Sequence, residues 1–93
     1  MLPSETCAQR LKLLEDSTRL AVVRCLMQGP ASVGAINDRI GIEQSLLSHH
    51  LKVLRDAGLI HSQRDGKQVI YALDAALQAD DAHLNLGCCR LSF

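Results

Sequence analysis

Residues 43–59 form one stretch whose apolar and polar side chains separate onto opposite faces at helical spacing. Leu47, Leu51 and Leu54 follow one another at intervals of four and three residues, which places them in one apolar stripe along an α-helix. Gly58 stands where a helix C-terminal cap is favoured. The pattern predicts a long amphipathic helix that ends just before this glycine and packs its leucine stripe against a core.

The opposite face of this predicted helix carries Ser45, Ser48, His49 and Lys52. A core-facing helix usually shows Glu/Lys pairs on its outer face, whereas short hydrogen-bonding side chains and one cation suit contacts with base edges or phosphate oxygens. The alternative is a solvated polar face, but serines are mildly unfavourable in a helix interior and need a reason to be there. We therefore predict that this face binds nucleic acid. His50 lies to one side, where we expect a half-buried residue that braces the helix or meets a phosphate.

The composition fits one small domain with an aliphatic core. Of the 93 residues, 47% are apolar, yet there is no Trp, one Phe and one Tyr, as in a helical domain. The formal net charge is zero, which argues against a non-specific nucleic-acid coat protein, because such proteins are usually basic. Between Ser45 and Lys67, however, four cations outnumber two acids. This local excess supports a groove reader with moderate phosphate contact.

The cellular compartment is suggested by what the chain lacks. No apolar run approaches the roughly 20 residues that span a bilayer, so we expect no transmembrane helix and no membrane contact. Residues 1–6 lack the charged and apolar regions of a signal peptide. We therefore expect a cytoplasmic protein whose four cysteines are reduced at rest.

Three shorter helices are predicted before the long one, over residues 5–14, 18–28 and 33–39. Gly41 allows a tight turn between the third of these helices and the long helix. Two helices joined by a Gly-containing turn, the second with a polar outer face, are typical of a helix-turn-helix, here at about residues 32–57.

A β-hairpin is predicted over about residues 60–73, where two runs of strand-forming residues flank Asp65-Gly66, a strong signal for a two-residue turn. Arg64 and Lys67 bracket the tip. They could be solubilising charges on an edge strand. A cationic hairpin directly after a recognition helix is, however, the layout of a winged helix-turn-helix, and we predict that both residues contact phosphate or the minor groove.

A last helix is predicted over about residues 75–86, with Asp74 as its N-cap. The first and last helices have few apolar partners in so small a chain, so we expect their stripes to meet those of a second subunit. Residues 1–93 are thus predicted to form one mainly α domain with a β-hairpin wing. This winged helix-turn-helix is expected to form a homodimer through its first and last helices.

Cys88 and Cys89 are adjacent thiols near the end of the chain, which are uncommon in a cytosolic protein unless they are used. They could bind one soft ion such as arsenite, Cd or Hg, with Cys7 as the third thiolate if the first and last helices pack together. A tail with incidental cysteines is the alternative. Cys25 lies among aliphatic residues, and we expect it to be a buried, inert thiol.

Short motifs along the chain carry a resemblance to a known family. They are Asp16-Ser17-Thr18-Arg19-Leu20, Gln44-Ser45, Ser48-His49-His50-Leu51, Leu54-Arg55-Asp56-Ala57-Gly58-Leu59-Ile60 and Arg64-Asp65-Gly66-Lys67-Gln68-Val69-Ile70-Tyr71-Ala72-Leu73. In this order and spacing they resemble the ArsR/SmtB family, small homodimeric winged-helix repressors that respond to metals or to thiol chemistry. The resemblance implies that the fourth helices of a dimer enter successive major grooves of an inverted-repeat operator. It also adds Gln44 and His50 to the residues expected to contact DNA.

We therefore expect a repressor that binds double-stranded DNA and is released by a thiophilic metal or metalloid such as arsenite, with no cofactor required. A thiol-redox or persulfide-responsive repressor is one alternative. A winged-helix protein-interaction module without DNA binding is another, but a protein-docking helix usually presents Leu, Met or aromatic anchors, which the polar face lacks. An enzyme is not expected, because the sequence shows no Ser-His-Asp or paired-carboxylate constellation.

Overall fold

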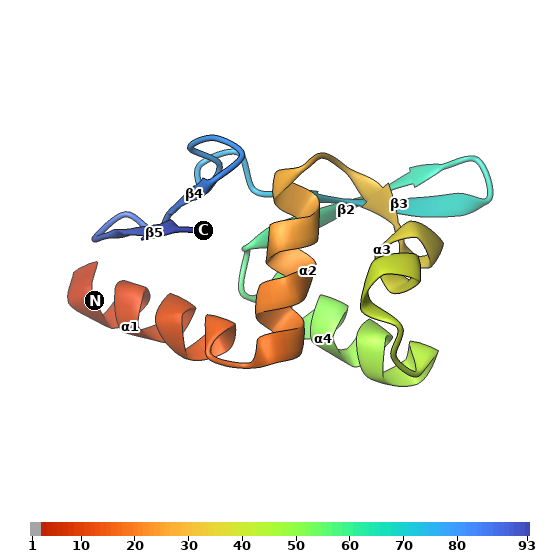
Figure 1. The fold of residues 1–93 in the computed structure, drawn as a ribbon, viewed down its shortest axis with the longest axis horizontal. Helices are drawn as coiled ribbons and strands as arrows, with labels where there is room; N and C mark the ends of the chain where they lie inside the picture. Colours follow the sequence, from red (N-terminus) through yellow and green to blue (C-terminus); the bar gives the residue numbers. More distant parts are fainter. Residues whose placement is uncertain (1–2) are drawn as a thin grey trace.

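The computed structural model describes residues 3–93, with side chains from Thr6 onward. The helices are α1 (Pro3–Leu14), α2 (Ser17–Met27), α3 (Val33–Ile40) and α4 (Gln44–Asp56). The strands are β1 (Ala31–Ser32), β2 (Ile60–Asp65), β3 (Gln68–Leu73), β4 (His83–Asn85) and β5 (Arg90–Ser92). In Figure 1, α2 stands in the middle, between α1 with the β4–β5 hairpin on one side and α3 with the β2–β3 hairpin on the other. Met1 and Leu2, part of the segment considered for a signal peptide, lie outside the described residues.

The core is built from aliphatic side chains of the helices, and the leucine stripe of α4 contributes to it as predicted. Leu47, Leu51 and Leu54 are fully buried and share one cluster with Leu26 of α2 and Ile36 of α3. Burying one such side chain contributes about 1.5–3 kcal/mol. The buried stripe therefore fixes which side of α4 faces outward. Within the described chain, no helix is long and apolar enough to cross a bilayer.

α4 ends in a Schellman motif, which confirms the cap predicted at Gly58. Gly58 has φ +80°, and its N–H donates to the carbonyl of Arg55 at 2.9 Å, while the N–H of Leu59 donates to that of Leu54 at 3.0 Å. Leu54 and Leu59 are both buried, so the motif turns the chain back onto the core. β2 begins one residue later, at Ile60, which places the wing directly beside the end of α4.

The predicted hairpin is present, but its turn lies one residue further along the chain. Asp65 pairs with Gln68, so the two loop residues are Gly66 and Lys67 rather than Asp65 and Gly66. Gly66 has φ +63°, and hairpin turns that begin with a positive φ favour glycine first. A strand that the sequence did not predict, β1, pairs antiparallel with β3. This pairing ties the wing to the start of α3.

The helix predicted over residues 75–86 is wrong. After β3 the chain makes turns in which aspartate side chains accept hydrogen bonds from backbone N–H groups. Asp74 Oδ2 accepts from the N–H of Ala76 at 3.1 Å, and Asp80 Oδ1 accepts from that of Ala82 at 2.8 Å. Such local hydrogen bonds compete with helical ones. Asp74 therefore caps a turn instead of a helix, and the end of the segment pairs as β4 with β5.

The turns and the β4–β5 hairpin still bury the leucines that the predicted helix would have buried, Leu77 and Leu84, together with Leu86. The hairpin lies beside α1 (Figure 1), and Arg10 Nη1 of α1 donates to the carbonyl of Leu86 at 2.9 Å. The expected dimer contact through a last helix therefore does not exist in this form. On α1, Leu11 stays 42% exposed.

Candidate functional site

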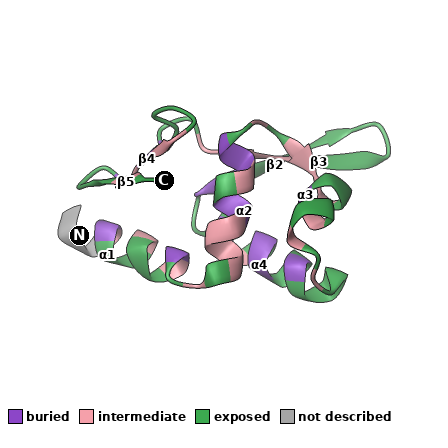
Figure 2. Cartoon of the chain, viewed as in Figure 1, coloured by how far each residue is buried: buried purple, intermediate pink, exposed green. Residues whose placement is uncertain are grey.

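The polar face of α4 is exposed along the length of the helix. Gln44, Ser45, Ser48, His49 and Lys52 are all exposed, as the sequence predicted, because the leucines of α4 turn the opposite side into the core. Figure 2 shows this exposed side of α4 at the lower edge of the molecule. An amide, two hydroxyls, an imidazole and an ammonium group are thus presented together. Each can exchange hydrogen bonds with base edges or phosphate oxygens.

Two other residues of α4 differ in how far they are exposed. Leu46, next to the buried Leu47 in the sequence, is 46% exposed. His50, expected among the DNA contacts, is only 8% exposed, and its Nδ1 lies 3.5 Å from Nη1 of Arg19. Arg19 in turn donates from Nε to the carbonyl of Leu13 at 2.7 Å. Of the two positions expected for His50, the structure therefore gives it the bracing one, in which it connects α4 to the junction of α1 and α2.

The turn between α3 and α4 is held by Asn37, which the sequence analysis did not single out. Its Nδ2 donates to the carbonyl of Ile42 and its Oδ1 accepts from the N–H of Ile42, both at 3.0 Å. Between them, Gly41 has φ +69° and donates to the carbonyl of Asn37 at 2.8 Å. These bonds set the direction in which α4 leaves the turn. An asparagine four residues before a helix-ending glycine was the signal that could have revealed this role.

The tip of the wing is exposed (Figure 2). The two predicted cations, Arg64 and Lys67, are both exposed there. Arg64 Nε donates to the carbonyl of Gly66 at 3.4 Å, and the Lys67 side chain lies in the two-residue loop. Within residues 6–93, ion pairs join His61 to Asp74 and His83 to Asp80, and neither wing cation takes part in one. Both charges are therefore free to meet an anion.

A hydrogen bond closes the base of the wing. His61 Nε2 of β2 lies 2.5 Å from Oδ1 of Asp74, the residue that follows β3. This hydrogen bond is the main cause that holds the pKa of Asp74 below its usual range, and the N–H of Ala76 lowers it further. The ionised carboxylate thus ties the two strands together at the end of the wing nearest α4.

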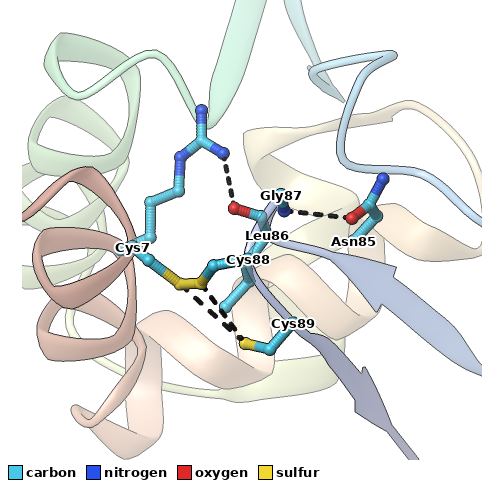
Figure 3. Close-up of a disulfide and its surroundings, with 7 residues drawn as sticks. Cys7, Asn85, Leu86, Gly87, Cys88 and Cys89 are labelled. Atoms are coloured by element: carbon cyan, nitrogen blue, oxygen red, sulfur yellow. Dashed lines mark hydrogen bonds between the residues drawn. A yellow bond between two sulfur atoms is a disulfide. The ribbon is translucent and has the colours of Figure 1, made fainter. Parts of the chain in front are cut away.

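A second candidate site joins segments from the two ends of the chain (Figure 3). Cys7 of α1 and Cys88 of the β4–β5 turn form a disulfide, with their Cα atoms 6.1 Å apart. The Sγ of Cys89 lies 3.9 Å from that of Cys7 and 3.8 Å from that of Cys88. The expectation that all four cysteines are reduced is therefore corrected for Cys7 and Cys88. The structure does bring together the three sulfurs predicted to bind a soft ion, all within 4.8 Å of one another.

The turn that carries the two adjacent thiols is ordered by its own hydrogen bonds. The N–H of Leu86 donates to the carbonyl of Cys89 at 2.9 Å. Gly87 has φ +94° and donates to Oδ1 of Asn85 at 3.0 Å. With Arg10 bound to the carbonyl of Leu86, these contacts hold the turn over α1 (Figure 3). The alternative of a loose tail with incidental cysteines does not describe this segment.

Cys25 is not part of this cluster. It is half-buried rather than fully buried, and Arg39 Nη1 donates to its Sγ at 3.8 Å. It borders an open hollow of about 350 Å³ that Arg24 and Phe93 also line. In the described part of the chain, the residues whose ligand atoms lie close enough together to hold a metal ion are Cys7, Cys88 and Cys89.

Comparisons with known proteins agree with this architecture. Residues 16–62 match the family described as "Bacterial regulatory protein, arsR family". The HTH-type transcriptional regulator NmtR of Mycobacterium tuberculosis is 37% identical over 92% of this chain and 81% of that protein. The crystal structure of the transcriptional repressor BigR from Xylella fastidiosa matches with a TM-score of 0.75 and 40% identity, covering 78% of this chain and 74% of that one. The homodimeric winged helix-turn-helix DNA-binding domain Mb0332 from Mycobacterium bovis matches with a TM-score of 0.70 and 28% identity, covering 76% and 66%.

Proposed function

This chain belongs to the ArsR family of bacterial regulatory proteins, and from that membership we propose how it binds DNA and what releases it. It is a transcriptional repressor of the DNA-binding type, not an enzyme. In the proposal, a homodimer in the cytoplasm binds an inverted-repeat operator in double-stranded DNA. A thiophilic metal or metalloid such as arsenite releases it by binding Cys7, Cys88 and Cys89.

The observation that carries the proposal is the exposed polar face of α4, on a helix whose opposite face is buried. Because the leucines fix the rotation of α4, Ser45, Ser48 and His49 face a partner together. Hydroxyl and imidazole groups can exchange hydrogen bonds with base edges in the major groove, and Gln44 can form paired bonds with adenine. Lys52 contributes a phosphate contact, which positions the helix without reading sequence.

The wing is proposed to contact the DNA backbone beside the helix. Arg64 and Lys67 lie at its exposed tip and are not neutralised by an ion pair within the described residues. The Schellman motif that ends α4 leads directly into β2, so a protein that places α4 in a groove also brings the wing close to the flanking phosphates or minor groove. Such contacts add affinity that is independent of sequence.

Two copies of α4 related by a two-fold axis require an operator with matching symmetry. The related domain Mb0332 is homodimeric, which supports a dimer for this chain. In the absence of a last helix, we propose that α1, with its exposed Leu11, contributes to the dimer contact. The two half-sites are then expected about 10 bp apart, centre to centre, or at a multiple of that spacing.

The inducer is proposed from the chemistry of the three sulfurs. Thiolates are soft ligands and favour thiophilic ions such as arsenite or Cd. An ion held between α1 and the β4–β5 turn would shift α1, and with it the angle between the subunits. The two α4 helices would then no longer match the half-site spacing. A coupling free energy of about 1–3 kcal/mol is enough to lower operator affinity roughly 5–150-fold.

Selection of binding sites from random duplex DNA with the full chain tests the proposal. We expect recovery of a pseudo-palindromic sequence with half-sites about 10 bp apart, or a multiple, bound by two chains per duplex. Sedimentation of the complex measures that stoichiometry. Recovery of unrelated sequences, or of one chain per duplex, would contradict the proposed mode of binding.

The inducer is tested on the selected operator. Arsenite and Cd should each release the reduced protein, and Cys25→Ser, the matched control, should be released equally well. Release of Cys88→Ser/Cys89→Ser at the same ion concentration would show that the inducer binds elsewhere.

A further inference from the structure

The three sulfurs of Cys7, Cys88 and Cys89 can take part in two kinds of bond that exclude each other. In the structure Cys7 and Cys88 share a disulfide, and the sulfur of Cys89 lies within 3.9 Å of both. A sulfur in a disulfide has no thiolate charge and is not a metal ligand. The same atoms are therefore either oxidised or able to bind an ion.

The distances from the Cys89 sulfur fit shared ligation of one ion. With metal–sulfur bonds of about 2.3 Å, as for zinc, the sulfurs of one tetrahedral or trigonal site lie about 3.8–4.0 Å apart. The Cys89 sulfur is 3.8 and 3.9 Å from the other two. Reduction of the disulfide would break only the bond between the sulfurs of Cys7 and Cys88. The hydrogen bond from Arg10 of α1 to the carbonyl of Leu86 would still hold the β4–β5 turn against α1.

We propose that Cys7, Cys88 and Cys89 form a redox-gated metal site. In the reduced protein the three thiolates bind one soft ion. Oxidation to the Cys7–Cys88 disulfide abolishes this binding, so the oxidised protein does not respond to the metal. The inference rests on the proposed function for its effect at the operator, but the gating itself is a property of the thiols.

The oxidation step requires a two-electron oxidant of the peroxide class. The Cys88 thiolate is exposed, and its attack on the peroxide breaks the O–O bond, giving a sulfenic acid and one water after proton uptake. The thiol of Cys7 then attacks this sulfur, forms the S–S bond and displaces the hydroxyl group as a second water. Two thiols thus lose two hydrogen atoms in total, and Cys89 remains a thiol. A dithiol reductant reverses the step by thiol–disulfide exchange.

Burial favours this order of events. Cys7 is only 5% exposed, whereas Cys88 and Cys89 are exposed on the turn. An external oxidant therefore reaches the turn first, and Cys7 acts as the resolving thiol from α1. Cys25 is held apart beside Arg39 and serves as an internal comparison.

Cadmium titration of the full chain in its reduced and peroxide-oxidised forms tests the proposal. Thiolate-to-cadmium charge-transfer absorption reports binding, and alkylation followed by mass spectrometry reports which thiols are free. We expect the reduced protein to bind one Cd per chain and to protect every cysteine except Cys25 from alkylation. We expect the oxidised protein to show no such absorption until it is reduced again. Equal Cd binding by the two forms would overturn the gating.

Two variants and one control identify the ligands. Cys89→Ser, an exposed change, should keep the disulfide but bind Cd more weakly in the reduced form. Cys7→Ser should lose the disulfide to α1 and also bind Cd more weakly, with its fold checked by circular dichroism. Cys25→Ser should behave as wild type in both forms, and wild-type Cd affinity in Cys89→Ser would exclude the three-sulfur site. None of these readouts uses DNA, so failure of the metal site and failure of operator binding are distinguished.

Discussion

Asp74 connects the end of the wing to its beginning through several hydrogen bonds. Its N–H donates to the carbonyl of Leu59 at 2.9 Å, and its carboxylate bonds the His61 ring and the N–H of Ala76. These bonds, chiefly that of His61, lower the pKa of Asp74 from its ordinary value of 3.8. The ionised carboxylate therefore stabilises the folded state more than the unfolded state.

Asp74→Asn should reduce the free energy of unfolding near neutral pH, and the difference from wild type should shrink in acid. A pKa that is depressed by folding contributes stability that is fully present above pH 3.8 and is lost as the pH falls through the folded value. Urea unfolding at a fixed protein concentration, from about pH 3 to about pH 6, measures this. Asp81→Asn, an exposed change in the same segment, is the control. A difference that is the same at every pH would show that Asp74 acts by some other means.

The geometry of the helix-turn-helix depends on the two hydrogen bonds between the Asn37 side chain and Ile42. Asn37→Ala removes both, and at about 0.5–1.5 kcal/mol each we expect a loss of about 1–3 kcal/mol in unfolding free energy. Operator affinity should fall as well, because α4 is no longer held at the same angle. Urea unfolding and operator titration measure the two effects, with the exposed neighbour Asp38→Ala as control. Wild-type behaviour in both assays would mean that the turn does not need this side chain.

Contact between the wing and DNA can be tested by changing the charge of the wing alone. Replacing Arg64 and Lys67 by Gln should weaken binding to every DNA sequence alike. The slope of log K against log salt should decrease by about 1.8, since each lost phosphate contact contributes about 0.9. Arg90→Gln, an exposed cation on the β4–β5 hairpin, should leave the slope unchanged. Equal slopes for the wild type and the wing variant would indicate that the wing does not touch DNA.

An element could be predicted where its sequence signals lie close together in the chain. It could not be predicted where the same residues suit two different local structures. The leucines of α4 and the cap at Gly58 were enough to predict that helix and its end, because each signal lies within a few residues of the next. Leu77 and Leu84 could be buried by a helix, but turns and a hairpin bury them in the structure. The aspartates between β3 and β4 favour these turns, because their carboxylates accept hydrogen bonds from backbone N–H groups. The inward position of His50 was predictable from its place beside the polar face, but its partner Arg19, 31 residues away, was not.

At the scale of the whole molecule, a contact between α1 and the β4–β5 hairpin joins the two ends of the chain. Cys7 and Cys88, which form its disulfide, are 81 residues apart in the sequence. The chemistry of thiols grouped Cys88 with Cys89, and Cys7 was added on the expectation that the first and last helices pack together. The packing that joins them could not be predicted, since a β-hairpin and not a helix covers α1. α4 and the wing lie beyond α2 from this contact (Figure 1), so a signal at the thiols must reach DNA through the helices or through the dimer.

The central claim is that the outer face of α4 reads DNA sequence, and a comparison of operator selectivity tests it most directly. The affinities of wild type and of Ser48→Ala/His49→Ala are measured by fluorescence anisotropy on the selected operator and on a scrambled duplex at one salt concentration. His83→Ala/Ser92→Ala, the same residue types on the β4–β5 hairpin, is the matched control. We predict that the double variant on α4 loses about 1–3 kcal/mol of discrimination for each base contact removed, with little change on the scrambled duplex. Unchanged selectivity in that variant would contradict the assignment of α4 as the recognition helix.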